Sequence, residues 1–275
     1  MIIIIQCEDR VGLVADISTV LANAGCNIVS MREHVDTDEN KFFVRIVVNG
    51  INDIQEIEKS IADVLPENAI VRVNPVPEKK IVVLVTKEYH CLSDILTRNH
   101  FKTLGASVLC VIGNHPDLKN ITDRYEIPFH FITHENREKE SFESELLKTI
   151  IPYNPDYIIL AKFMRILSPE FVDSFKLKII NIHHSFLPAF IGANPYSQAY
   201  KRGVKIIGAT AHFVTNDLDD GPIIVQKTTT INHSYKLADL IKAGRENETS
   251  ALIRAMQLVF EDRVFVYNNK TVVFE

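Results

Sequence analysis

The sequence predicts an α/β protein of two domains, a small ferredoxin-like βαββαβ domain followed by a doubly wound, mostly parallel sheet. Three observations lead to this prediction. The first 75 residues contain strand-like and helix-like segments in the order βαββαβ. The stretch "NPVPEKK" then carries two prolines and three charges, which is typical of a linker. From Lys80 onward, continuous apolar strands alternate with helices, as in a parallel sheet buried on both faces. The predicted domains are residues 1–75 and 81–275, with the linker at 76–80.

The spacing of apolar residues predicts the helices and strands of the first domain. Apolar residues at helical spacing, among them Val11, Val14, Ile17 and Leu21, predict one buried helical face in the first helix. Strands are predicted at 1–7, 26–35, 41–48 and 69–75, helices at 11–24 and 54–64, and a hairpin turn at Thr37–Asn40.

The second domain alternates strands with helices up to a final hairpin. Strands are predicted at 80–86, 107–114, 128–133, 156–163, 178–184, 209–215 and 223–231. Helices are predicted after the first strand, from 117, and at 138–150, 237–243 and 250–260, with a last hairpin around Asn268 and Asn269. Ligands of such sheets bind outside the carboxyl ends of the strands, so functional residues are expected in the loops there.

Composition narrows the classes of partner. The 275 residues are 46% hydrophobic, which is enough for real cores, yet no apolar run is long enough for a membrane span. No basic targeting segment precedes the first strand, so a cytoplasmic protein is expected. The four cysteines, Cys7, Cys26, Cys91 and Cys110, lack metal-type spacing and are predicted to be reduced and buried. The net charge of −5, without a stripe of basic residues, disfavours nucleic acid and favours a small-molecule ligand.

Polar side chains end the apolar strand in "INIHHSFLP", residues 180–188. Side chains alternate along a strand, so Asn181 and His183 point to one side and His184 to the other. At the carboxyl end of a parallel strand, Asn181 and His183 are expected to project into the ligand crevice. The alternative is that both only bond neighbouring loop backbone. For His184 we expect no more than a role in orienting the turn into Ser185.

Three aspartates crowd the loop "AHFVTNDLDDGP", residues 211–222. Asp220 precedes a glycine and is explained by turn chemistry, whereas Asp217 and Asp219 are not. A carboxylate opposite an imidazole and a carboxamide suits amide or formyl chemistry, since it combines an acid/base group with donors for a carbonyl oxygen. His183, His184 and His212 are of a type that binds metals, but they lack the spacing of metal ligands, so no metal site is predicted.

The stretch from "NIHHSFLPAF" to "DLDDGPII", residues 181–224, resembles the signature of the folate-dependent formyl hydrolase/transferase family. The resemblance extends over "VTKEYHCLSDIL", "VIGNH", "DYIILAKFMRILSPEF" and "AGR", and so from Lys80 to the C-terminus. It implies a Rossmann-like, formyltransferase-type domain. "EDRVGLVADISTVLANAGCNIVSM", residues 8–31, resembles an ACT domain, a βαββαβ module that family members carry ahead of the catalytic domain.

The resemblance also implies roles for individual residues. The family's N-I-H motif and the L-D before Gly-Pro fall on Asn181, His183 and Asp219, which are therefore the expected catalytic residues. The segment "KFMRILS" matches the family's pterin-lining loop and implies folate contacts at Met164, Arg165, Ile166 and Leu167. Contacts with the backbone around residues 214–218 are implied as well, at Val214, Thr215, Asp217 and Leu218. Without the resemblance, Met164, Ile166 and Leu167 would be interpreted as ordinary core. The substrate of such enzymes is the folate itself, so no cofactor is expected.

The implied reaction is hydrolysis of 10-formyltetrahydrofolate to formate and tetrahydrofolate, a step of one-carbon metabolism that supplies formate for purine biosynthesis. The alternative is formyl transfer to a small amine such as glycinamide ribonucleotide. That activity needs a glycine-rich phosphate cradle, whereas "TKEYHCLSDIL" has no glycine and contains Glu88, which would repel a phosphate. A third hypothesis is a non-catalytic amino-acid or folate sensor, which the complete set of three catalytic residue types disfavours.

The ACT resemblance implies an amino-acid effector near Gly12, Leu13, Asn27 and Ile28, with the alternative that the domain serves assembly alone. Sheet edges of such modules favour symmetric pairing, so a homo-oligomer is expected. One departure concerns "GANPYSQAY", where the family pattern usually has other residues at Asn194 and Ser197.

Overall fold

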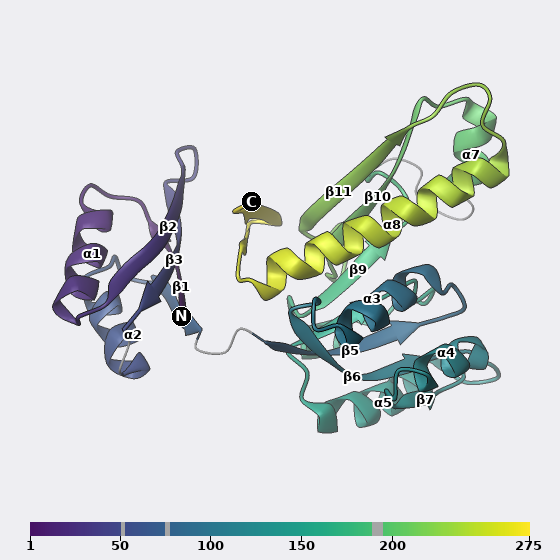
Figure 1. The fold of residues 1–275 in the computed structure, drawn as a ribbon, viewed down its shortest axis with the longest axis horizontal. Coiled ribbons are helices and arrows are strands. Elements are labelled where there is room, and N and C mark those ends of the chain that lie inside the picture. Colours follow the sequence, from purple (N-terminus) through teal and green to yellow (C-terminus); the bar gives the residue numbers. More distant parts are fainter. Residues whose placement is uncertain (51–52, 75–77, 189–194) are drawn as a thin grey trace. The chain divides into compact units, whose positions relative to one another are not determined.

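The computed structural model describes residues 1–50, 53–74, 78–188 and 195–275, and it divides into two compact units (Figure 1). The first unit contains Met1–Pro77, Glu261–Tyr267 and Val272–Glu275. The second contains Glu78–Phe260 and Asn268–Thr271. Within the described ranges, no helix is both long enough and apolar enough to cross a membrane.

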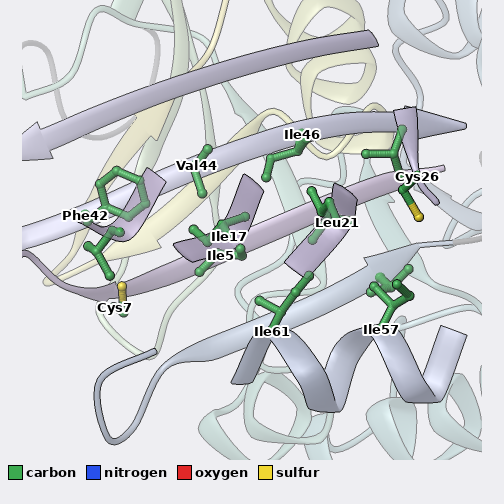
Figure 2. Close-up of a cluster of buried hydrophobic side chains, with 14 residues drawn as sticks. Ile5, Cys7, Ile17, Leu21, Cys26, Phe42, Val44, Ile46, Ile57 and Ile61 are labelled. Carbon is green, nitrogen blue, oxygen red and sulfur yellow. The ribbon is translucent and has the colours of Figure 1, made fainter. Parts of the chain in front are cut away.

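The first unit has the predicted ferredoxin-like topology. Its elements are β1 (Ile2–Glu8), α1 (Leu13–Asn23), β2 (Asn27–Asp36), β3 (Lys41–Asn49), α2 (Ile54–Asp63) and β4 (Ile70–Asn74). The strand order is β2-β3-β1-β4, and each neighbouring pair is antiparallel. Ile3, Ile5 and Cys7 alternate inward along β1 and meet Ile17 and Leu21 of α1 in one core, part of which Figure 2 shows.

Helix α1 begins two residues later than predicted. Gly12 has a left-handed φ of 93°, and the chain enters the helix only after it. Val11 is therefore 98% exposed, and its predicted place on the buried helical face is wrong.

The predicted C-terminal hairpin is confirmed as β12 (Val264–Tyr267) and β13 (Lys270–Val273). Asn268 and Asn269 both have positive φ, as the central residues of a tight hairpin turn require. Phe265 and Phe274 pack with Phe43 of β3, so these aromatic contacts join the ends of the hairpin to the first unit. The sequence-based division had placed the whole segment in the second domain.

The second unit contains a seven-stranded sheet in the order β11-β10-β9-β8-β5-β6-β7. Its strands are β5 (Lys79–Val85), β6 (Ala106–Gly113), β7 (Phe129–Phe131), β8 (Tyr157–Leu160), β9 (Ile179–His183), β10 (Ile206–Phe213) and β11 (Ile223–Thr230). Strands β5 to β9 are parallel, and β10 runs antiparallel to both of its neighbours. The chain reverses its direction of winding between β5 and β8, so the predicted doubly wound and mostly parallel sheet is confirmed.

Both faces of this sheet are buried. The helices are α3 (His90–His100), α4 (Lys119–Asp123), α5 (Lys139–Ile150), α6 (Pro169–Ser174), α7 (Pro195–Arg202) and α8 (Leu237–Phe260), with short 3₁₀ turns at Pro116–Leu118 and Ile151–Tyr153. Val82 and Leu84 of β5 pack in a cluster with α5 and α6, while Val83 on the opposite face is also fully buried. The linker was predicted to reach residue 80, but β5 already begins at Lys79.

Helix α8 is one continuous helix of 24 residues, whereas two helices with a break between them were predicted. The predicted break contains Gly244, Asn247 and Glu248, and all three are buried in the middle of the helix. Thr229 of β11 donates a hydrogen bond of 2.9 Å to Oδ1 of Asn247. The side-chain oxygen of Asn247 therefore has a hydrogen-bond partner inside the protein.

Candidate active site

A cavity of about 730 Å³ lies where the carboxyl ends of β8 and β9 meet the loop that follows β10. Its size is ordinary for a small-molecule site. It is lined by the three residues expected to be catalytic, Asn181, His183 and Asp219. It is also lined by all eight residues expected to contact folate, Met164, Arg165, Ile166, Leu167, Val214, Thr215, Asp217 and Leu218. Segments separated by up to about fifty residues thus converge on one cavity.

His183 and Asp219 form a buried pair. Nδ1 of His183 lies 3.2 Å from Oδ2 of Asp219, and only 6% of the imidazole is exposed. Nε2 of His183 is buried and has no hydrogen-bond partner among the residues that the structure describes. Burial raises the pKa of the Asp219 carboxyl, but the hydrogen bond and the electrostatic interaction with His183 outweigh this, so its pKa is lowered overall. Asp219 is therefore a carboxylate at neutral pH, and the imidazole offers a ligand its free nitrogen.

Asn181 is oriented by His212, a residue that the sequence analysis considered only as a metal ligand. Nδ1 of His212 lies 2.9 Å from the carbonyl oxygen of Phe213, and it must carry the proton because that oxygen can only accept. Nε2 of His212 then accepts from Nδ2 of Asn181 at 3.2 Å. Burial lowers the pKa of His212, which favours this neutral form. The bond leaves the second N–H of the Asn181 carboxamide for a ligand.

Gly221 positions the aspartate loop. A Cβ atom at this residue would lie 1.8 Å from the carbonyl oxygen of Phe213, so only glycine allows the loop to approach β10 this closely. The amide of Phe213 also donates to the carbonyl oxygen of Pro222 at 2.9 Å. Asp219 has a φ of 56°, a left-handed conformation that aspartate tolerates better than most residues. The loop thereby holds the carboxylate against His183.

Apolar side chains line the mouth of the cavity. Met164, Ile166 and Leu218 are between 55% and 61% exposed, so the interpretation of Met164 and Ile166 as core is wrong. Leu167 does pack against the apolar core. Exposed apolar side chains gathered at a cavity are typical of a ligand-binding surface. The loop itself is held by Thr86 after β5, whose hydroxyl accepts from the amide of Met164 at 2.9 Å.

A second, polar group in the cavity wall was missed by the sequence analysis. It surrounds Glu248, which is 1% exposed. Nε2 of His90 lies 2.7 Å from Oε2 of Glu248, and the ammonium of Lys162 lies 3.2 Å from the same oxygen. The hydroxyl of Tyr196 donates to Oε1 of Glu248. Although burial raises the pKa of Glu248, these partners outweigh it and lower that pKa to about 2. We call these four residues the Glu248 cluster.

Gly244 explains part of this packing. A Cβ atom at residue 244 would lie 2.2 Å from the ring of Tyr196. The glycine of the "AGR" segment thus allows Tyr196 to reach Glu248, which lies one helical turn further along α8. A glycine inside a predicted helix can thus indicate that another side chain packs directly against the helix backbone.

His184 lies in the cavity wall as well, contrary to the expectation that it faces away from the site. β9 ends at His183, so strict alternation of side chains no longer applies to the next residue. Its ring centroid lies 5.1 Å from that of His183 and 6.2 Å from that of Tyr196. Burial, with Lys162 and His183 nearby, lowers the pKa of His184 to about 4, so this imidazole is neutral at neutral pH.

The remaining candidates divide between the two units. Gly12 and Leu13 line a cavity of about 500 Å³ in the first unit, whereas Asn27 and Ile28 are not among its lining residues. Ser197 lies half-buried in α7, outside the lining of the catalytic cavity, and Asn194 falls outside the described residues.

Among the described residues, the potential ligand atoms of His90, Cys91 and Glu248 are close enough together to reach one metal ion. The chemistry of this group does not favour a cation. The ammonium of Lys162 already neutralises the carboxylate, and burial raises the pKa of the Cys91 thiol far above neutrality. The four cysteines are all buried and free, as predicted.

Comparison with known proteins agrees with this geometry. Residues 79–256 match the formyl transferase family, and residues 1–66 match the ACT domain family. The chain is 47% identical to the formyltetrahydrofolate deformylase of Haemophilus influenzae, over 99% of this chain and 98% of that protein.

The solved structures that resemble this chain fall into two groups, which differ in the degree of similarity. A formyltetrahydrofolate deformylase from Pseudomonas syringae superimposes with a TM-score of 0.94 at 36% identity, over 100% of this chain and 94% of that one. A glycinamide ribonucleotide transformylase from Symbiobacterium toebii reaches 0.69 at 26% identity, over 72% of this chain and 95% of that one. The similarity to the transformylase is thus lower and less extensive.

Proposed function

The chain belongs to the formyltetrahydrofolate deformylase family, and on this premise we propose that Asn181, His183 and Asp219 hydrolyse 10-formyltetrahydrofolate to formate and tetrahydrofolate. The observation that carries the proposal is the convergence of these three side chains in one cavity, where the buried Nε2 of His183 meets no partner from the described part of the chain. A buried polar atom without a partner costs free energy unless a ligand satisfies it.

Water is the nucleophile in the proposed reaction. Oδ2 of Asp219 is engaged by His183, so Oδ1 is the oxygen that would accept a proton from water as the water attacks the formyl carbon. The carbonyl oxygen becomes an oxyanion, which the carboxamide N–H of Asn181 and an N–H at Nε2 of His183 would stabilise. Since Nδ1 donates to Asp219, an N–H at Nε2 exists only in the doubly protonated imidazole, which is the form that this role requires.

Collapse of the intermediate breaks the bond between the formyl carbon and N10. The proton taken from water passes by way of Asp219 to the departing N10, and formate and tetrahydrofolate leave. We propose that the exposed apolar side chains of the 164–167 loop and the 214–218 loop hold the pterin ring, with Arg165 available to an anionic group of the substrate. The residues proposed here act without a metal or an organic cofactor.

The surroundings of α3 favour hydrolysis over transfer to a phosphorylated amine. Glu88 lies just before α3, where it pairs with Arg245 at 2.8 Å and lies 3.7 Å from Nδ1 of His90. These charges largely neutralise one another, and a phosphate placed there would meet the carboxylate. No glycine-rich loop occurs at this helix terminus.

The test is formate release by the purified protein from 10-formyltetrahydrofolate in a buffer that contains no amine. We expect equal amounts of formate and tetrahydrofolate, because each turnover consumes one water molecule. Formate that appears only after an amine is added, or no formate at all, would refute the proposed hydrolysis.

For the first unit we propose an amino-acid effector bound at the cavity near Gly12 and Leu13. Calorimetric titration with glycine and with methionine should show saturable heat for at least one of them, and Gly12→Val should abolish that heat by distorting the left-handed turn that shapes the cavity, while formate release continues. Silence for both amino acids in an active preparation would favour an assembly role. We further propose a cytoplasmic homo-oligomer.

A further inference from the structure

The Glu248 cluster is neither required by the proposed chemistry nor explained by stability. Lys162 and Glu248 are 8% and 1% exposed, and a buried ion pair is generally no more stabilising than a well-packed apolar pair. Both side chains nevertheless lie in the wall of the catalytic cavity. A buried charged pair in the wall of the catalytic cavity is therefore a candidate for a role in the reaction.

The backbone of Lys162 supports the same conclusion. Its φ is 63°, a left-handed conformation that glycine adopts freely and lysine does not. The amide of the preceding Ala161 donates to the carbonyl oxygen of Leu84, which fixes the chain at this point. Strained residues of this kind occur preferentially at functional sites. The lysine is thus held in an unfavourable conformation at the end of β8, where its ammonium reaches Glu248.

The position of the cluster within the sheet is also informative. His90 follows β5 and Lys162 follows β8, and these two strands are the neighbours between which the sheet reverses its winding. Ligands of doubly wound sheets bind at this reversal. Here the protein's own side chains occupy it.

An amine acceptor would need a buried carboxylate at such a place. Most aliphatic amines are ammonium ions at neutral pH, so an acceptor needs an anionic partner before it can lose a proton and attack the formyl carbon. Glu248 is that kind of carboxylate, but the ammonium of Lys162 and the donors of His90 and Tyr196 already occupy it. The carboxylate that an ammonium acceptor would need is therefore already paired with Lys162.

We propose that Lys162 is a specificity-determining residue, whose ammonium occupies Glu248, excludes amine acceptors and leaves water as the nucleophile. The inference rests on the proposed hydrolysis. Without the lysine side chain, an amine would form the new bond to the formyl carbon, the bond to N10 would break, and a proton from the amine would pass to N10. The products would be a formylated amine and tetrahydrofolate.

The test uses Lys162→Gly with glycinamide as the amine and 10-formyltetrahydrofolate as the donor. The variant relieves the left-handed strain and frees one side of Glu248. We expect the ratio of N-formylglycinamide to formate, measured by mass spectrometry, to rise about tenfold or more over the natural protein, the size of effect that one changed contact in a binding pocket produces. Glycinamide should also raise the melting temperature of the variant's folate complex and not that of the natural protein.

Lys102→Gly is the matched control. Lys102 also has a left-handed φ, 56°, but it is exposed and lies outside the lining of the cavity, so its product ratio should not change. Lys162→Met removes the ammonium and keeps the length of the side chain, and we expect it to raise the ratio as well. This variant answers the question if the glycine variant does not fold.

The proposal is overturned if folded Lys162 variants keep the product ratio of the natural protein and show no thermal shift with glycinamide. It is equally overturned if the natural protein already formylates glycinamide as readily as it releases formate. Absence of formate from the natural protein without amine would instead refute the proposed hydrolysis, so the two failures are distinguishable.

Discussion

Replacing Asp219 with asparagine is expected to lower formate release by about 100-fold or more, the contribution of a positioned general base. The carboxylate accepts from Nδ1 of His183 at 3.2 Å and is the group that can take a proton from water. Asparagine has nearly the same shape and tolerates the φ of 56° at this residue, so the loop should keep its conformation. Turnover should therefore fall while folate affinity, measured by equilibrium titration, changes little.

Asp220→Asn is the control for this prediction. Asp220 is the next residue, it carries the same charge, and its side chain is exposed outside the lining of the cavity. We expect it to keep the turnover of the natural protein. If Asp219→Asn also kept that turnover, water activation by this carboxylate would have to be abandoned.

The convergence of Asn181, His183 and Asp219 in one cavity could be predicted because two strong constraints act on these residues. Side-chain alternation along β9 places Asn181 and His183 on the same side, and the topology of a parallel sheet brings loops at the carboxyl ends together. Among the three aspartates, turn chemistry explained Asp220, and the family resemblance distinguished Asp219. The register of β9 and β10, which places His212 beside Asn181, depends on an antiparallel pairing that the local sequence does not reveal.

The Glu248 cluster could not be predicted, because each member has an ordinary local explanation. Glu248 belongs to the polar run "GRENET", which is typical of an exposed or broken helix when only sequence neighbours are considered. Its partners His90, Lys162 and Tyr196 lie from 52 to 158 residues away along the chain. A polar segment can therefore be buried when its partners come from distant parts of the chain. Because the local sequence does not show these partners, two helices were predicted where α8 is one.

Gly221→Ala is expected to have the second large effect, because the added Cβ would lie 1.8 Å from the carbonyl oxygen of Phe213. This oxygen belongs to the backbone and not to a flexible side chain, so the backbone of the aspartate loop must move. The same Cβ would approach Nδ1 of His212 to 3.3 Å and disturb the bond that orients Asn181. A displacement of about 1 Å at catalytic groups costs about 100-fold in rate, and we expect a loss of turnover of that order.

A control variant distinguishes an effect on the position of the catalytic groups from an effect on the stability of the protein. Gly105→Ala introduces a side chain at a φ of 77° with only an ordinary contact at 4.0 Å, far along the chain from the aspartate loop. It should lower the free energy of unfolding by about 1 kcal/mol or more through backbone strain, while turnover of the folded fraction stays unchanged. In Gly221→Ala, turnover should fall well beyond any loss of folded protein measured by circular dichroism. A Gly221→Ala variant with normal turnover would show that Asp219 does not depend on this close approach of loop and strand for its position against His183.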